Sequence, residues 1–99
     1  MIITGPQCRA ARALVQLSAE KIATRAGLEV QLLRDFENGL LDPGAEFKRV
    51  LRETLELGGA VFIPENGGGR GVRLKYSSRD VVGVNKWEAE GGPAGEDDV

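Results

Sequence analysis

Apolar residues in the first half of the chain recur three or four positions apart, which is the spacing of one face of a helix. The pattern predicts four short helices. The first follows Thr4, whose side chain can cap it, with Gln7 three residues later as the capping-box partner and Pro6 in the tolerated first turn. Its inward positions are predicted to be Cys8, Ala11, Leu14 and Val15.

The second and third helices are separated by a tight turn. Ser18 is the predicted N-terminal cap of the second helix, and Gly27 is placed to end it in a left-handed conformation. The third helix is predicted from about Val30 to Asn38, with Gly39 as its C-terminal cap. The inward positions of the two helices are predicted to be Ile22, Ala23, Ala26, Leu33 and Phe36.

A fourth helix is predicted over the run GAEFKRVLRETLEL. Asp42 is its predicted cap, with Pro43 at the first helical position, and Gly58-Gly59 stops it. Its inward stripe is predicted to be Phe47, Val50, Leu51, Thr54 and Leu55.

After residue 59 the pattern changes to short β-prone segments. Residues 60–64 and 71–76 flank ENGGGR, a run suited to a turn with positive φ, so a β-hairpin is predicted. Because two strands alone are marginal in water, the hairpin is expected to lie against the helices or to pair its edge with a second copy of the chain. In the remaining extension, Val81 to Val84 suit one more short strand, and the Gly-, Pro- and acid-rich end is predicted to be disordered. The chain thus divides into a helical domain over 1–58, a hairpin over 59–76 and an extension over 77–99.

Composition narrows the possible chemistry. The 99 residues, 41% hydrophobic and 28% charged, suit one globular domain. No apolar run approaches the roughly 20 residues of a membrane helix, and the N-terminus lacks a signal-peptide pattern, so a cytoplasmic protein is expected. With one cysteine and no histidine, we expect no disulfide, no metal site and no nucleophile–histidine pair. The run GGGRG lacks the closing Gly-Lys-Ser/Thr of a P-loop, so neither an enzyme nor a bound cofactor is predicted.

The charge distribution is neutral where a nucleic-acid contact would be sought. The net charge is −2, residues 1–57 carry equal numbers of basic and acidic side chains, and the excess acid lies mainly in Glu96-Asp97-Asp98. Only a docking face has to be positive, so the net charge does not exclude binding to nucleic acid.

The run SAEKIATRAGLEVQLLRDFENG resembles the helix-turn-helix of the Cro/C1-type (Xre) bacterial and phage repressors. The resemblance extends over residues 4–57, and GGAVFIPENGGGRGVRLK looks like the hairpin appended to many small proteobacterial regulators of this type. It implies a mainly α, compact four-helix DNA-binding domain, in which Arg12 forms a structural ion pair with Glu37. The positions that match the family pattern are Ser18, Ile22, Ala23, Gly27, Leu28, Leu33, Glu37, Asn38 and Gly39.

The resemblance also implies a recognition helix over about 29–38 that lies in the major groove of double-stranded DNA. Helical spacing leaves Val30, Gln31, Arg34 and Asp35 on the outer face of this helix. Gln31 can bond to adenine, and Arg34 can reach guanine or a phosphate. Asp35 can accept a hydrogen bond from cytosine N4, or it can have a structural role by pairing with Arg34 or Lys21 of the protein. Val30 can contact a thymine methyl group.

Backbone phosphates are expected to contact residues near the ends of the second and third helices. Two positions depart from the family pattern: Ala19 stands where the family has a DNA-contacting glutamine, and Glu29 stands where it has a capping Ser or Thr. Glu29 favours the helix dipole but brings negative charge to the place where a phosphate should dock. The predicted phosphate contacts are Ser18, Lys21, Arg25, Asn38 and, near the first helix, Arg9.

A domain of this size makes few direct contacts with DNA, so a homodimer on a two-fold symmetric operator is expected. The hairpin is the predicted dimer contact, with Leu55 and Leu57 as further candidates. The predicted function is sequence-specific transcriptional regulation. The alternative is a protein-interaction module on the same fold, an anti-activator or antitoxin whose outer face binds another regulatory protein. The hairpin residues assigned to the dimer contact are Val61, Ile63, Val72 and Leu74.

Overall fold

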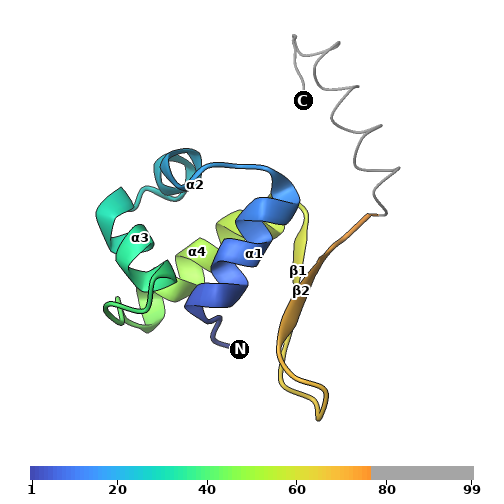
Figure 1. Cartoon of the computed structure of the whole chain (residues 1–99). Coiled ribbons are helices and arrows are strands. Elements are labelled where there is room, and N and C mark those ends of the chain that lie inside the picture. Colours follow the sequence, from blue (N-terminus) through green and yellow to red (C-terminus); the bar gives the residue numbers. More distant parts are fainter. Residues whose placement is uncertain (77–99) are drawn as a thin grey trace, which may run out of the picture.

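The computed structural model describes residues 1–76 and shows a mainly helical, compact unit with a small antiparallel hairpin (Figure 1). The predicted strand near residues 81–84 and the predicted disorder at the C-terminal end lie outside the described residues. No helix within the described part combines the length and apolar character needed to cross a membrane. The elements in chain order are α1 (Gly5–Val15), α2 (Ala19–Ala26), α3 (Val30–Glu37), α4 (Ala45–Leu57), β1 (Ala60–Ile63) and β2 (Gly71–Leu74).

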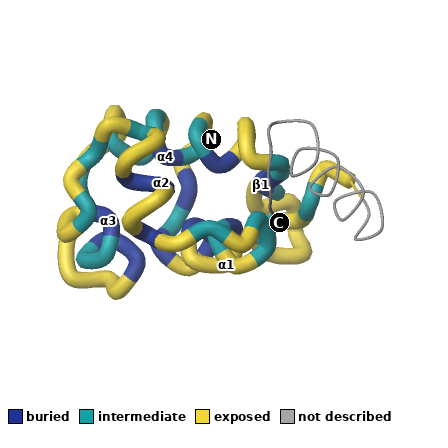
Figure 2. The backbone as a smooth tube through the Cα atoms, turned by 90° about the horizontal axis from the view of Figure 1, so that it is seen from above, coloured by how far each residue is buried: buried dark blue, intermediate teal, exposed yellow. Residues whose placement is uncertain are grey.

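One core joins the four helices to the hairpin, and its residues follow the inward sides of the backbone (Figure 2). Eight of the fourteen predicted inward positions are buried, and the other six are half-buried: Leu14, Val15, Ala26, Phe47, Val50 and Thr54. Complete burial of a large apolar side chain stabilises a fold by roughly 1.5–3 kcal/mol. The apolar residues of the core are Ile3, Cys8, Ala11, Ala19, Ile22, Ala23, Leu33, Phe36, Leu51, Leu55, Ala60 and Phe62.

The predicted ends of α1 and α2 are confirmed. Thr4 Oγ1 accepts from the Gln7 amide at 3.2 Å and Gln7 Oε1 accepts from the Thr4 amide at 3.0 Å, which completes the capping box. Ser18 caps α2 through the Lys21 amide at 3.1 Å. Gly27 ends α2 at φ 69°, in the left-handed region that glycine adopts without a Cβ penalty.

The predicted start of α4 is wrong. Gly44, at φ 96° and ψ 162°, occupies the N-cap position and offers no side chain to the first turn. Asp42 lies two residues before this cap, so its carboxylate accepts from the Gly44 amide at 2.9 Å and closes a local turn instead. A hydrogen bond from Lys48, at 2.9 Å from Asp42 Oδ1, together with the Gly44 amide, lowers the pKa of Asp42.

The hairpin packs against α1 and α4, as one of the two expectations for it required. Ala60 pairs with Leu74 and Phe62 with Val72, so these four residues share one face of the ribbon. Phe62 and Ala60 are buried on that face. The loop between the strands contains glycines at positive φ, as ENGGGR predicts. The hairpin and α3 lie at opposite ends of the molecule, with α1 and α4 between them (Figures 1 and 2).

Gln7 fastens the hairpin to α1. Its side chain is 5% exposed, and its Nε2 donates to the carbonyls of Gly71 at 3.0 Å and Ile63 at 3.4 Å. The same amide group therefore caps α1 through its oxygen and holds the loop end of the ribbon through its nitrogen. A two-stranded ribbon gains a fixed orientation on the helices from this contact and from buried Phe62.

Candidate nucleic-acid interface

The turn between α2 and α3 is fixed by backbone hydrogen bonds and by one apolar side chain. After Gly27, the Leu28 amide donates to the Ala23 carbonyl at 2.9 Å, and the Leu28 side chain packs against the core. On α3, Leu33 is fully buried and Phe36 is 7% exposed. The opposite face of α3 is therefore turned to solvent and held in place from beneath.

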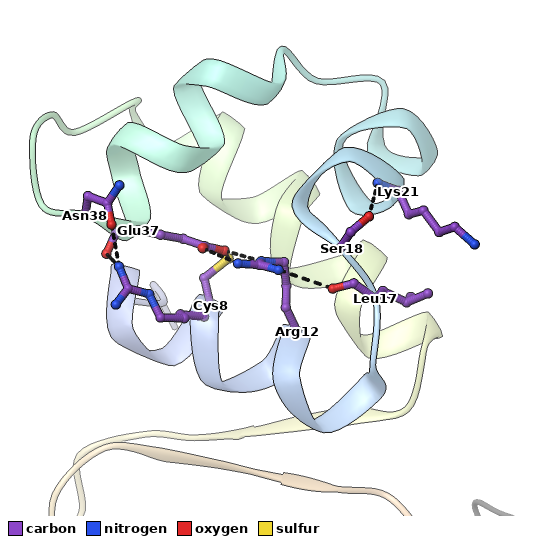
Figure 3. Close-up of polar contacts among 8 residues, drawn as sticks. Cys8, Arg12, Leu17, Ser18, Lys21, Glu37 and Asn38 are labelled. Carbon is purple, nitrogen blue, oxygen red and sulfur yellow. Dashed lines mark hydrogen bonds and ion pairs between the residues drawn. The ribbon is translucent and has the colours of Figure 1, made fainter. Parts of the chain in front are cut away.

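An ion pair ties the C-terminal end of α3 to α1 (Figure 3). Arg12 Nε donates to Glu37 Oε2 at 2.6 Å and Arg12 Nη2 donates to Glu37 Oε1 at 2.7 Å. The third arm of the guanidinium, Nη1, donates to the Leu17 carbonyl at 3.2 Å. This geometry is the pairing that the family resemblance implies for Arg12 and Glu37. The hydrogen bond that Arg12 donates to the Glu37 carboxylate raises the pKa of Arg12, so the guanidinium stays charged.

Cys8 belongs to the same hydrogen-bond network, and its thiol is expected to be unreactive. Its Sγ donates to Glu37 Oε2 at 3.1 Å, and the residue has no exposed surface. Burial, and then the neighbouring Glu37 carboxylate, raises the pKa of the Cys8 thiol. The protonated thiol therefore serves as a hydrogen-bond donor inside the core and is a poor nucleophile.

The outward residues of α3 lie together, and three of the four already have partners within the chain. Gln31 is exposed, and its Nε2 donates to Asp35 Oδ1 at 3.0 Å, one helical turn along. Arg34 pairs across the turn with Glu20 of α2, and the side chains are 41% and 62% exposed. Val30 is half-buried and packs partly against the core, so only part of it is available to a ligand. We refer to Val30, Gln31, Arg34 and Asp35 as the α3 face.

Glu29 caps α3. Its backbone is extended at φ −78° and ψ 125°, and its carboxylate accepts from the Leu32 amide at 3.0 Å. The glutamate thus provides the cap that Ser or Thr commonly provides at a helix N-terminus, and its charge lies close to the positive end of the helix dipole.

The residues expected to contact phosphates lie at two separate places. Ser18, Lys21 and Arg25 are exposed on α2, and neither basic residue forms an ion pair within residues 1–76. Asn38 is exposed at the end of α3, where its Oδ1 accepts from Arg9 Nη2. Ser18 and Asn38 stand on opposite sides of the Arg12–Glu37 pair (Figure 3).

Sequence analysis missed Glu20 as a member of this surface. The sequence spacing of Glu20 and Arg34 does not predict their ion pair. The rule that residues three or four apart can pair applies within one helix, whereas Glu20 lies on α2 and Arg34 on α3. The largest contribution to the lowered pKa of Glu20 is a hydrogen bond from its own backbone amide in the first turn of α2, and the next is the charge of Arg34. Glu20 is therefore ionised and placed beside the α3 face.

The four residues assigned to a dimer contact do not form one surface. Val72 and Leu74 share the inner face of the ribbon with Phe62, and Val72 packs against the core. Val61 and Ile63 lie on the outer face, where Val61 is paired with Arg73. All four assigned residues are half-buried in the single chain.

The further candidates for a dimer contact, Leu55 and Leu57, differ sharply in exposure. Leu55 has no exposed surface and belongs to the core, so its assignment to a subunit contact is wrong. Leu57 is 91% exposed at the end of α4 and is available to a partner. The two leucines are only two residues apart, about half a helical turn, so they lie on different sides of α4, and the inward stripe ends at Leu55.

Comparison with known proteins identifies no relative for this chain: no protein-family model matches it, and no curated protein matches it.

Proposed function

We propose that the chain is a sequence-specific DNA-binding regulator of the Cro/C1 type, in which α2 and α3 form the helix-turn-helix. The observation that carries the proposal is the α3 face: four outward residues on a short helix whose inner side is fixed by Leu33, Phe36 and Glu37. A helix of this kind fits the major groove of B-DNA, which is about 12 Å wide. Such a regulator performs no chemistry and acts in the cytoplasm.

The roles of the contact residues follow from their chemistry. Gln31 bonds to adenine, and Arg34 bonds to guanine or to a phosphate. Asp35, which now accepts from Gln31, either orients that amide or accepts from cytosine N4. Lys21 supplies a charge that holds a backbone phosphate near the N-terminus of α2, where the Ser18 hydroxyl is also available, and Arg25 supplies a second charge in the last turn of α2.

A second copy of the chain is the proposed partner at the hairpin. One domain offers few base contacts, whereas two copies reading half-sites about one helical turn apart gain both affinity and specificity. The hairpin lies at the opposite end of the molecule from α3, so pairing there leaves the α3 face open (Figure 1). A monomeric mass in solution at micromolar concentration would refute this dimer.

A protein-interaction module is the second candidate, and the contents of the α3 face favour it. Gln31 and Arg34 are already bound to carboxylates of the same chain. Leu32 is 38% exposed beside them, and Glu29 keeps a negative charge at the start of α3. A face of this kind suits a partner protein that presents apolar and basic groups.

Selection of genomic DNA fragments by the purified full chain at low salt separates the two candidates. The DNA proposal predicts enrichment of a defined sequence, and Gln31→Ala is expected to relax preference at one base pair of each half-site. Gln16→Gly is the control, because Gln16 is an exposed glutamine at the end of α1 that is not among the proposed contact residues, and the change should leave the base preference unaltered although it affects stability. Failure to enrich any sequence would overturn the DNA proposal in favour of the protein partner.

A further inference from the structure

Three carboxylates lie on or beside the α3 face, and each of them has a partner within the chain. Glu29 binds the Leu32 amide and Asp35 binds Gln31, and both of these contacts lie within α3. Glu20 differs, because it reaches across from α2 to the guanidinium of Arg34. We propose that Glu20 is a specificity-determining residue that acts through Arg34; this inference rests on the proposed binding of DNA.

The Glu20–Arg34 pair is suited to exchange. Both side chains are substantially exposed, at 62% and 41%, and exposed ion pairs are weak because water and salt screen them. A guanidinium carries five N–H donors, whereas the pair involves Nη2 of Arg34 and Oε2 of Glu20. An incoming acceptor can therefore displace Glu20 without unfolding either helix.

The carboxylate makes this exchange selective. A phosphate that approaches Arg34 without a matching base gains one contact, but it also meets the negative charge of Glu20. Guanine offers Arg34 two acceptors, O6 and N7, and carries no net charge that Glu20 repels. Glu20 thus weakens sequence-independent contacts of Arg34 more than it weakens a guanine contact, which raises discrimination at the cost of affinity.

The test measures the affinity of the full chain for two duplexes, the selected sequence and a scrambled one of equal length, by fluorescence anisotropy at fixed salt. Glu20→Gln is expected to strengthen binding to the scrambled duplex by about threefold, as expected for removing one like charge a few ångströms from a phosphate in water. Binding to the selected duplex is expected to change less, so the ratio of the two affinities falls.

Two further variants show whether the effect belongs to this pair. Glu56→Gln makes the same change of charge on α4, where Glu56 is exposed and forms no ion pair within the described residues, and it should leave the affinity ratio unchanged. In an Arg34→Gln background, Glu20→Gln should no longer alter the ratio, because the residue through which Glu20 acts is gone. Far-UV circular dichroism checks that each variant keeps the helical content of the native chain.

The inference is overturned if Glu20→Gln strengthens binding to both duplexes equally or leaves both affinities unchanged. It is also overturned if Glu20→Gln still alters the ratio of the two affinities in the Arg34→Gln background. If the native chain binds neither duplex, the proposed function has failed as well, and the absence of any binding distinguishes that result from failure of the inference alone.

Discussion

Removal of the Glu37 carboxylate is expected to destabilise the fold strongly. In Glu37→Ala, the Arg12 guanidinium loses two hydrogen bonds, and its side chain, 20% exposed, keeps its charge without a counter-charge. The Cys8 thiol loses its acceptor in the same step. The variant also removes the side-chain contacts of Glu37 with α1, whereas the bond from Arg9 to the Glu37 carbonyl remains.

The exposure of Arg12 sets the size of the expected loss in the free energy of unfolding. Breaking a buried ion pair by removing one partner costs about 3–5 kcal/mol. Arg12 retains some contact with solvent and its bond to the Leu17 carbonyl, so the cost should lie at or just below the bottom of this range, and we expect a loss of about 2–3 kcal/mol. For a domain of this size, each kcal/mol shifts the melting temperature by about 4–8 °C, so Tm should fall by about 10–20 °C.

Urea unfolding followed by far-UV circular dichroism measures this loss. Glu53→Ala is the control, because it removes an exposed carboxylate that is paired with Arg49 on the surface of α4, and it should leave the free energy of unfolding nearly unchanged. Replacing both Arg12 and Glu37 by leucine should recover much of the stability, since no unpaired charge remains. The reasoning is refuted if Glu37→Ala costs no more than the control.

Three further outcomes follow from the packing around α1. Gln16→Gly should stabilise the chain by roughly 0.5–1 kcal/mol in urea unfolding, because Gln16 sits at φ 60°, where an L side chain is strained; a lower urea midpoint would contradict this. Gly5→Ala should cost about 1–3 kcal/mol in the same assay, because the added Cβ would lie 2.4 Å from the Phe36 carbonyl oxygen, and a neutral effect would show that α1 and α3 separate easily. Cys8, buried and with a raised pKa, should react with thiol reagents on the order of a hundredfold more slowly in the native chain than in urea, and equal rates would place it at the surface.

The parts of the fold that the sequence predicts well are those fixed by neighbouring residues. The Thr4–Gln7 capping box, the Ser18 cap and the left-handed Gly27 each depend on positions three or four apart, so their residue types identify them. The hairpin is visible for the same reason, because its β-prone segments flank a glycine-rich turn.

Features that depend on tertiary contact could not be read from spacing. Asp42 is a local exception: it has the residue type and the following proline of a helix cap, but the carboxylate closes a turn on the Gly44 amide and the helix begins after Gly44. Glu20 meets Arg34 only because the turn between α2 and α3 brings two helices together. The second role of Gln7, which holds the hairpin carbonyls, likewise needs the helix and the ribbon to be in place.

The salt dependence of duplex binding tests the central claim most directly. The affinity of the purified chain for the selected duplex is predicted to fall steeply and linearly, on logarithmic axes, as salt is raised, with a slope of about −0.9 for each phosphate contact. Lys21→Ala should reduce the slope by about one while keeping the sequence preference, because Lys21 is an exposed cation on α2. An affinity that does not change with salt, or the absence of any binding to duplex DNA even at low salt, would contradict the proposal that α2 and α3 bind DNA.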